Sequence, residues 1–130
     1  MMKKLKFETD DTKLGFTKAA GFLWADQKGV HVEYQVSDNI FELYKSEVKE
    51  VFFPFKTIEE INHNMSWWLF NGGQICISLN SLKNTNDIPF IEDNGLIFNL
   101  KRKNKNKGKD FAVNTQLELY NYRLVQLNRL

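Results

Sequence analysis

The chain has few of the residues and segments that form disulfides, span membranes or direct export. Its 130 residues include one cysteine, Cys76, so no internal disulfide can form and the cytoplasm is the expected compartment. No run of 18 apolar residues occurs, and therefore no membrane-spanning helix is expected. The first eight residues, Met1 to Glu8, lack the apolar core of a signal peptide, so we expect no export signal.

Histidines, which often serve as metal ligands, are also scarce. His31 and His63 fall on different predicted strands, and neither has a cysteine or a carboxylate at the spacing of a metal site. His63 is in phase with Ile61 and Met65, which indicates a hydrogen-bonded histidine of the sheet. His31 lies on a polar strand face, where we expect it to be solvated. The sequence therefore predicts no metal site.

Activated nucleophiles and phosphate-binding loops are missing as well. Cys76 shares a strand face with Ser78 and Asn80, but nothing in the sequence supplies a base beside it. The glycine pair in Asn71-Gly72-Gly73 joins two strands, whereas a phosphate loop joins a strand to a helix. We therefore predict that the protein is not an enzyme and has no catalytic residues and no cofactor.

What the sequence does contain is a series of short alternating segments. In the clearest one, the apolar residues occupy one face of an extended chain: Val30, Val32, Tyr34 and Val36. A period of two is typical of a half-buried β-strand. The same pattern predicts strands at about residues 5–9, 16–25, 30–36, 51–55, 61–67, 75–79 and 96–100.

Turn-forming residues separate these segments. The stretch 26–29 predicts a tight hairpin, and Asn71-Gly72-Gly73 predicts a second one. Pro54 removes a backbone donor, so its strand should lie at a sheet edge or end there. Residues 56–61 resemble a single helical turn, and the stretch 81–94, rich in Asn and Asp, predicts a loop.

The helical pattern begins only near the C-terminus, at about residues 110–127. Asp110 is a plausible N-cap, and one apolar stripe follows it at steps of four, three, four and three residues: Val113, Leu117, Tyr120, Leu124 and Leu127. A stripe of this kind is expected to be buried, and the open end of a bent sheet is the surface that could receive it. We therefore expect the stripe to pack against the sheet.

Seven strands followed by one C-terminal helix resemble the order of a pleckstrin-homology-like (PH-like) barrel. The segments that resemble small bacterial members of this family are 21–34, 48–58, 71–77 and 81–89, and the resemblance covers about residues 15–127. It implies a partly open barrel of about seven antiparallel strands, made of two bent sheets and plugged by the helix. On this interpretation residues 1–130 form a single domain, with strands at about 5–100.

The resemblance also implies a non-catalytic scaffold that docks proteins or, in some members, phosphoinositides. Lipid-binding members place several Lys and Arg on the first hairpin and the neighbouring strand. Here that region offers only Lys18, Lys28 and His31, interrupted by Asp26 and Glu33. Because multivalent phosphate needs several converging cations, we predict no specific inositol-phosphate site.

Positive charge is concentrated in one run between the last strand and the helix. The run holds six cations and no acidic residue: Lys101, Arg102, Lys103, Lys105, Lys107 and Lys109. Without these six, the 12 remaining basic residues face 16 acidic ones. The run is either an ordinary solvated strand end and loop or a diffuse patch for an anionic membrane or nucleic acid. Nucleic acid is the weaker interpretation, because no aromatic residues interleave with the lysines.

A cluster of aromatic residues precedes Asn71-Gly72-Gly73. Alternation that buries Trp67 and Leu69 places Trp68 and Phe70 on the opposite face, near the predicted turn. Either a loop covers these two side chains, or they form a partner surface or a membrane-touching wedge. We predict a protein-interaction or self-association module. A small barrel that holds an apolar ligand is the other interpretation, although eleven Phe and a helix plug favour a filled core.

Overall fold

The computed structural model describes residues 4–9, 17–38, 47–66, 70–80, 88–92 and 94–129. In chain order the elements are β1 (Leu5–Glu8), β2 (Thr17–Ala25), β3 (Gly29–Asp38), β4 (Lys49–Pro54), the 3₁₀-helix η1 (Phe55–Thr57), β5 (Ile58–Ser66), β6 (Phe70–Leu79), β7 (Ile91–Glu92), β8 (Gly95–Asn99), the 3₁₀-helix η2 (Arg102–Asn104) and α1 (Lys105–Asn128).

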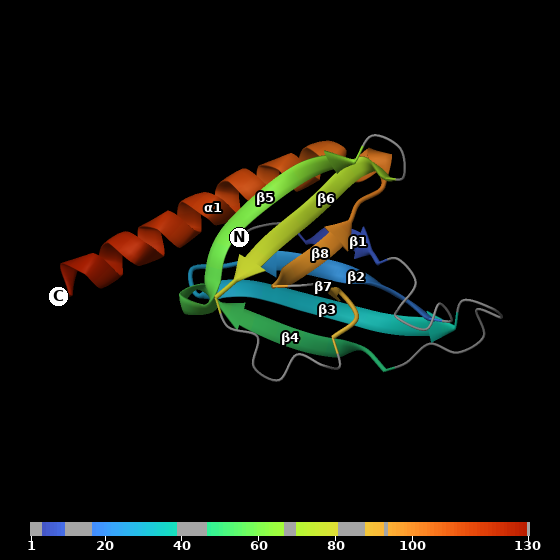
Figure 1. Cartoon of the computed structure of the whole chain (residues 1–130), viewed down its shortest axis with the longest axis horizontal. Helices are drawn as coiled ribbons and strands as arrows, with labels where there is room; N and C mark the ends of the chain where they lie inside the picture. Colours follow the sequence, from blue (N-terminus) through green and yellow to red (C-terminus); the bar gives the residue numbers. More distant parts are fainter. Residues whose placement is uncertain are drawn as a thin grey trace.

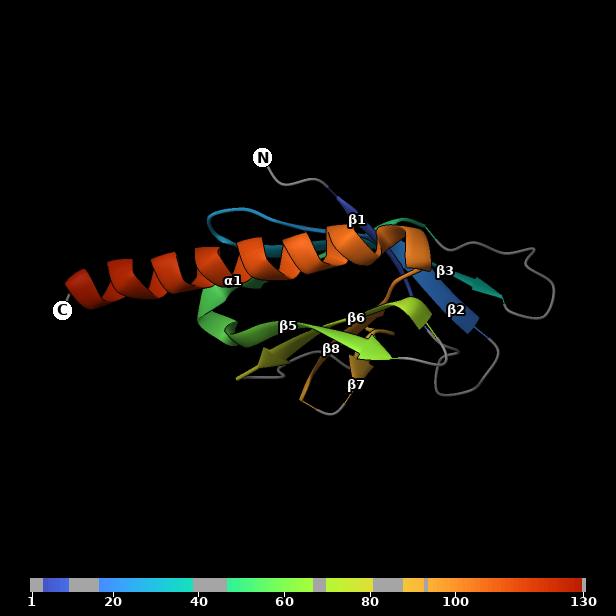
Figure 2. The ribbon, with the colours of Figure 1, turned by 90° about the horizontal axis from the view of Figure 1, so that it is seen from above.

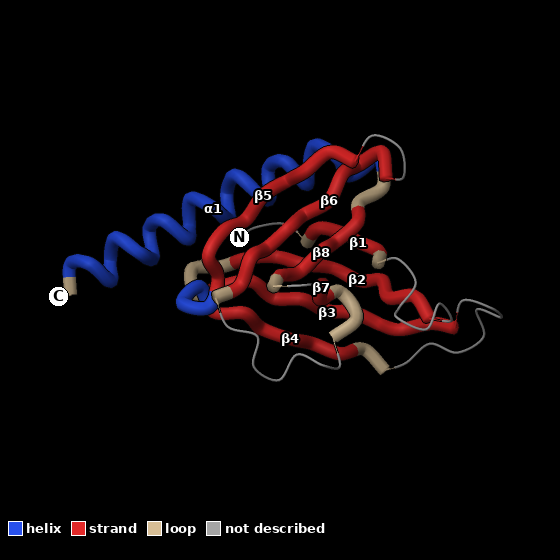
Figure 3. The backbone as a smooth tube through the Cα atoms, viewed as in Figure 1, coloured by secondary structure: helices blue, strands red, loops and turns tan. Residues whose placement is uncertain are grey.

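The strands of the described residues form one antiparallel sheet that bends around a core (Figure 1). The strand order is β4-β3-β2-β1-β8-β6-β5, and the short β7 pairs with β8. Because β4 and β5 end this order, the sheet does not close. Figure 3 shows how strands dominate the described chain before α1. The predicted fold class is confirmed: the chain is mainly antiparallel β, an open barrel capped by one C-terminal helix.

The core lies inside the bend, where the alternating apolar residues meet. The predicted inward faces of β3, β6 and β8 are confirmed, with these side chains buried: Val30, Val32, Tyr34, Ile75, Ile77, Leu79, Leu96 and Phe98. Pro54 ends β4, and β4 lies at a sheet edge, as predicted. The predicted helical turn is η1, which is shorter than expected because β5 already begins at Ile58.

Phe90 completes the core from a stretch that the sequence predicts to be a loop. It is 2% exposed, and its ring centroid lies 4.9 Å from that of Phe98, 5.2 Å from that of Tyr34 and 5.9 Å from that of Phe7. The next two residues form β7, which pairs with β8. The local sequence does not predict this strand, because its pairing depends on contacts with distant residues and not on an alternating pattern of its own.

The hairpin between β2 and β3 forms as predicted, and Asp26 holds it together. Asp26 Oδ1 accepts hydrogen bonds from the backbone N–H groups of Lys28 (2.8 Å) and Gly29 (3.1 Å), and Asp26 Oδ2 lies 2.8 Å from His31 Nε2. Partial burial raises the pKa of Asp26, but the Lys28 amide, His31 and the Gly29 amide together outweigh it, so this pKa is below its usual value. The ionised carboxylate is therefore the form that fits the fold.

We expect the contribution of Asp26 to stability to depend on pH. A carboxyl whose pKa is lowered by folding stabilises the folded state above the usual Asp value of about 3.9, and loses this contribution as the pH falls through the lowered value. Asp26→Asn should lower the free energy of unfolding by about 1 kcal/mol or less at neutral pH, because the group is largely exposed. Urea unfolding of both proteins from neutral to acidic pH should show the difference shrinking. A constant difference would contradict this assignment.

The prediction of a hairpin turn at Asn71-Gly72-Gly73 is wrong. β5 ends at Ser66 and β6 begins at Phe70, so Asn71-Gly72-Gly73 lies inside β6 and not at the turn. The glycines serve close packing: a Cβ on Gly72 would collide with the Lys101 carbonyl oxygen and lie 2.6 Å from that of Leu100. Gly73 has a φ of +82°, which only glycine adopts readily. Sequence alone cannot distinguish this use of a glycine pair from a turn.

The helix begins five residues earlier than predicted. Most of the basic run lies in η2 and the first turns of α1, not in an extended segment, and Asn104 rather than Asp110 is the N-cap residue. Gly108 allows this early start because a Cβ there would collide with the Leu100 side chain and lie 3.1 Å from His63 Cδ2. The early turns are therefore fixed by close contact with the sheet, which overrides the loop-like composition of the segment.

The predicted burial of the helix stripe is wrong. α1 packs on the sheet through another face, formed by Gly108, Phe111, Ala112, Thr115 and Leu119. We use the name helix stripe for the predicted set, and all of its members are exposed: Val113 (60%), Leu117 (55%), Tyr120 (51%), Leu124 (58%) and Leu127 (62%). Three of the buried residues, Gly108, Ala112 and Thr115, are small and let the helix approach the sheet closely, while the helix stripe is turned outward.

Candidate functional site

The rotation of α1 is fixed by polar contacts with the free edge of β5. Gln116 Oε1 accepts a hydrogen bond from the Ile61 backbone N–H (2.9 Å). The Arg123 guanidinium donates to the backbone carbonyls of Glu59 (2.6 Å) and Ile58 (3.3 Å). These contacts satisfy edge groups that would otherwise be available to another strand. They also hold the helix stripe away from the sheet.

A groove runs along the junction of α1 and β5, next to the helix stripe. Its volume is about 550 Å³, and its apolar lining comes from Ile61, Met65, Ala112, Val113 and Leu117. Met65 itself is 47% exposed. Because Val113 and Leu117 belong to both the groove and the helix stripe, the two features form one continuous apolar surface.

The C-terminal part of α1 extends past the sheet, as Figures 1 and 2 show. All residues from Arg123 to Arg129 are exposed. Helical segments of this length are marginally stable in water unless an apolar face is packed. The projecting segment carries Leu124 and Leu127, so the helix stripe continues past the described part of the sheet.

The structure does not test the predicted partner surface at Trp68 and Phe70. Trp68 lies outside the described residues. Phe70 begins β6, where it pairs with Ser66, and only its backbone is described. The proposal of a rim contact at these two residues therefore stays a prediction. Nearby, Met65 adds an exposed apolar side chain to the same end of β5.

The basic run forms a cluster at the start of α1, in helical turns and not in a strand end and loop. Lys101 Nζ is 3.3 Å from Glu8 Oε1, and Lys18 Nζ is 3.4 Å from Glu8 Oε2. Burial raises the pKa of Glu8, but the two lysines outweigh it and the net pKa is lowered. Lys105 is half-buried, whereas the other five cations of the run are exposed: Lys101, Arg102, Lys103, Lys107 and Lys109.

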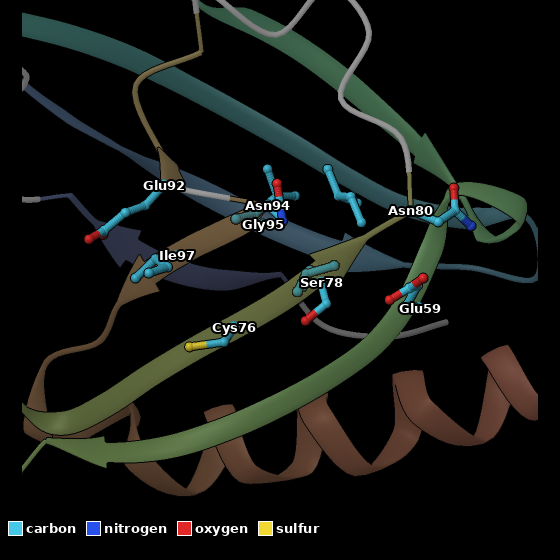
Figure 4. A pocket seen from close by; sticks show the side chains of 11 residues that line it. Glu59, Cys76, Ser78, Asn80, Glu92, Asn94, Gly95 and Ile97 are labelled. Carbon is cyan, nitrogen blue, oxygen red and sulfur yellow. The ribbon is translucent and has the colours of Figure 1, made fainter.

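A polar hollow lies on the outer face of β6, between β5 and β8 (Figure 4). Its volume is about 690 Å³, and its polar lining includes Glu59, Cys76, Ser78, Asn80 and Glu92. Figure 4 shows these side chains spread along the hollow rather than directed at one point. The arrangement has no nucleophile paired with a base among the described residues, so it gives no basis for a catalytic assignment.

Cys76 is the candidate nucleophile that the sequence singles out in this hollow. Burial raises the pKa of its thiol, a hydrogen bond from Asn64 opposes this effect, and the negative charge of Glu92 adds to it. Asn64 Nδ2 lies 3.4 Å from Cys76 Sγ. Since the thiolate is the nucleophilic form, a raised pKa disfavours reaction at neutral pH.

The two histidines have different surroundings. His63 Nε2 lies 2.8 Å from the Gly72 carbonyl oxygen, which confirms the predicted hydrogen-bonded histidine of the sheet. His31 was expected to be solvated, but it is half-buried: its ring stacks on Trp24 at 5.2 Å and lies 4.6 Å from that of Phe52. Among the described residues, no group of three His, Cys, Asp or Glu side chains could hold a metal ion.

Comparison with known proteins assigns no family to the chain. No family model, no curated protein and no solved structure matches it. Within the described residues, no helix has both the length and the apolar character to cross a membrane. The candidate site therefore depends on geometry alone, and the helix stripe with its adjoining groove is its clearest feature.

Proposed function

We propose that the protein is a non-catalytic interaction module whose docking surface is the helix stripe together with the α1–β5 groove. The observation that carries this proposal is the outward position of five large apolar side chains in one line. Single exposed apolar residues are common, whereas a continuous apolar patch usually marks a contact surface. Covering about 100 Å² of each of these five side chains would contribute roughly 2.5 kcal/mol each, about 12 kcal/mol per copy before the cost of association is subtracted.

A protein partner fits this surface better than a membrane. Amphipathic helices that lie on membranes are typically rich in Lys and Arg beside the apolar face. Here the side chains flanking the helix stripe include Asn114, Gln116 and Asn121, and Arg123 is already bonded to the edge of β5. The nearly neutral flanks favour an apolar, protein-derived occupant.

The resemblance to PH-like domains also supports the proposal of a non-catalytic docking module. The open antiparallel barrel with a C-terminal helix agrees with the element order of that resemblance, although its strands form one bent sheet and not two. PH-like members commonly act as docking scaffolds without catalysis. We place the module in the cytoplasm, in keeping with the single cysteine of its sequence.

A matched pair of substitutions tests the proposed docking surface. Leu124→Glu puts a charge in the helix stripe, whereas Val125→Glu puts the same charge at a neighbouring exposed position outside it; the original side chains are 58% and 48% exposed. In pull-downs from the source cell, we expect partners to be retained by the wild type and by Val125→Glu and lost from Leu124→Glu. Equal retention by all three folded proteins would contradict the proposal.

The basic cluster supports a second candidate function, binding of an anionic surface. Cations in the first turns of a helix oppose its dipole, and here they are Lys105 and Lys107, with no acidic residue in the first turn. This arrangement lowers helix stability, so its presence favours a role in binding. It places the cluster's five exposed cations together at one end of α1, and four of them lie beside Lys101, which pairs with Glu8.

If the cluster binds anions, binding should depend steeply on salt. Four phosphate contacts predict a loss of roughly 100-fold in affinity for duplex DNA between about 50 and 200 mM salt. The triple change to Gln at Lys103, Lys107 and Lys109 should remove binding, and the control triple at Lys28, Lys49 and Lys56 should retain most of it. Anionic vesicles serve as a second probe. Affinity that is independent of salt, or lost equally in both triples, would contradict a role for this cluster.

A further inference from the structure

The spacing of the helix stripe limits the shape of its occupant. Steps of four, three, four and three residues repeat every seven, which places the five side chains at the core positions of a two-helix seam. A narrow apolar seam of this kind packs better against another helix than against a flat surface. A helix that faces a protein core usually shows a broader apolar face. The occupant is therefore best matched by an equally long helix with the same spacing.

We propose that the occupant is a second copy of this chain, with the two α1 helices packed antiparallel about a twofold axis. This inference rests on the proposed docking function and names its partner. In the pair, Leu117 packs against Leu127 of the partner subunit, and Tyr120 packs against Leu124 of the partner subunit. The projecting end of each helix then lies on the part of the other helix that is anchored to its own sheet.

Charge favours the antiparallel arrangement over the parallel one. In a parallel pair, the two basic clusters would lie side by side and repel. In an antiparallel pair they lie at opposite ends, farther apart than the roughly 36 Å length of a 24-residue helix and well beyond the screening length of about 8 Å. Across the seam, Arg123 lies on the same flank as Arg123 of the partner subunit, but each guanidinium is bonded to the Glu59 and Ile58 carbonyls at the edge of its own β5.

The exposed area indicates a dimer of moderate affinity. At about 100 Å² for each half-exposed side chain, the helix stripe offers roughly 500 Å² per copy, against about 800 Å² per partner in a standard interface. The flanking amides and Met65, beside the groove, would supply the remainder. Association in the micromolar range is expected, because each copy is already folded around its own core.

Sedimentation equilibrium of the purified full chain tests this inference, with Cys76→Ser as the background for the cysteine variants below. We expect a dimer with a dissociation constant of about 1–100 µM. Leu124→Glu should raise this constant at least about 100-fold, and Val125→Glu should change it by less than about 3-fold. Near-UV circular dichroism of each variant checks that the sheet remains folded, as expected for substitutions of exposed residues.

Disulfide trapping then tests the orientation. Leu117→Cys and Leu127→Cys proteins should cross-link when mixed, and neither should cross-link efficiently alone. Efficient self-cross-linking of each variant alone would overturn the antiparallel arrangement. A wild-type chain that stays monomeric up to about 1 mM would show that a second copy does not cover the helix stripe. If Leu124→Glu still lost a cellular partner in that case, the docking function would stand with a different protein.

Discussion

Replacing Leu119 by alanine should lower the free energy of unfolding by about 2–5 kcal/mol, because the side chain is fully buried and its removal leaves a cavity. Leu117→Ala, on the same helix, should lower it by less than about 0.5 kcal/mol, since Leu117 is 55% exposed and alanine is a good helix former. The two positions differ by only two residues, so the pair reports directly which face of α1 contacts the sheet.

Urea unfolding at a low protein concentration measures both effects without a contribution from association. The opposite order, with Leu117→Ala more destabilising than Leu119→Ala, is what burial of the predicted stripe would produce. That result would reverse the observed orientation of the helix and remove the proposed docking surface.

A single methyl group at Gly72 should be almost as damaging as the cavity at Leu119. The added Cβ would meet the backbone carbonyls of Lys101 and Leu100, and hydrogen bonds hold this backbone in place: Gly72 N–H to Leu100 O (3.2 Å) and Leu100 N–H to Gly73 O (3.0 Å). We expect Gly72→Ala to lower the free energy of unfolding by about 3 kcal/mol or more.

Ser78→Ala is the matched control for Gly72→Ala, because Ser78 lies on the same strand and lines the open polar hollow. Its effect should be below about 1 kcal/mol. If Gly72→Ala is tolerated as well as Ser78→Ala, then the glycine does not serve close packing, and the placement of residues 71–73 inside β6 is wrong.

Much of the sheet could be predicted from the sequence because its strands are half-buried. Val30, Val32 and Tyr34 alternate with polar residues, and this alternation records directly which side faces the core. The signal fails where pairing is decided by distant residues. β7 is two residues long and Phe90 stands in a polar stretch, so their positions depend on β8 and on the aromatic core.

The helix shows why the docking surface could not be predicted. Hydrophobicity identifies apolar side chains but does not say which of two apolar faces is buried. The buried face includes Gly108 and Thr115, which a hydrophobic pattern does not select, while the helix stripe has the stronger pattern. The choice is made by Gln116 and Arg123 through bonds to the edge of β5, and that edge is known only from the strand order.

The central claim is that the helix stripe is in contact with another protein in the cell. Site-specific photo-cross-linking in the source cell tests it most directly, with the photoreactive residue placed at position 117, 124 or, as the control, 125. The account predicts a discrete cross-linked product from positions 117 and 124 and little from 125, and a product of twice the mass of the chain if the partner is a second copy. Equal cross-linking from all three positions, or none from 117 and 124, would contradict it.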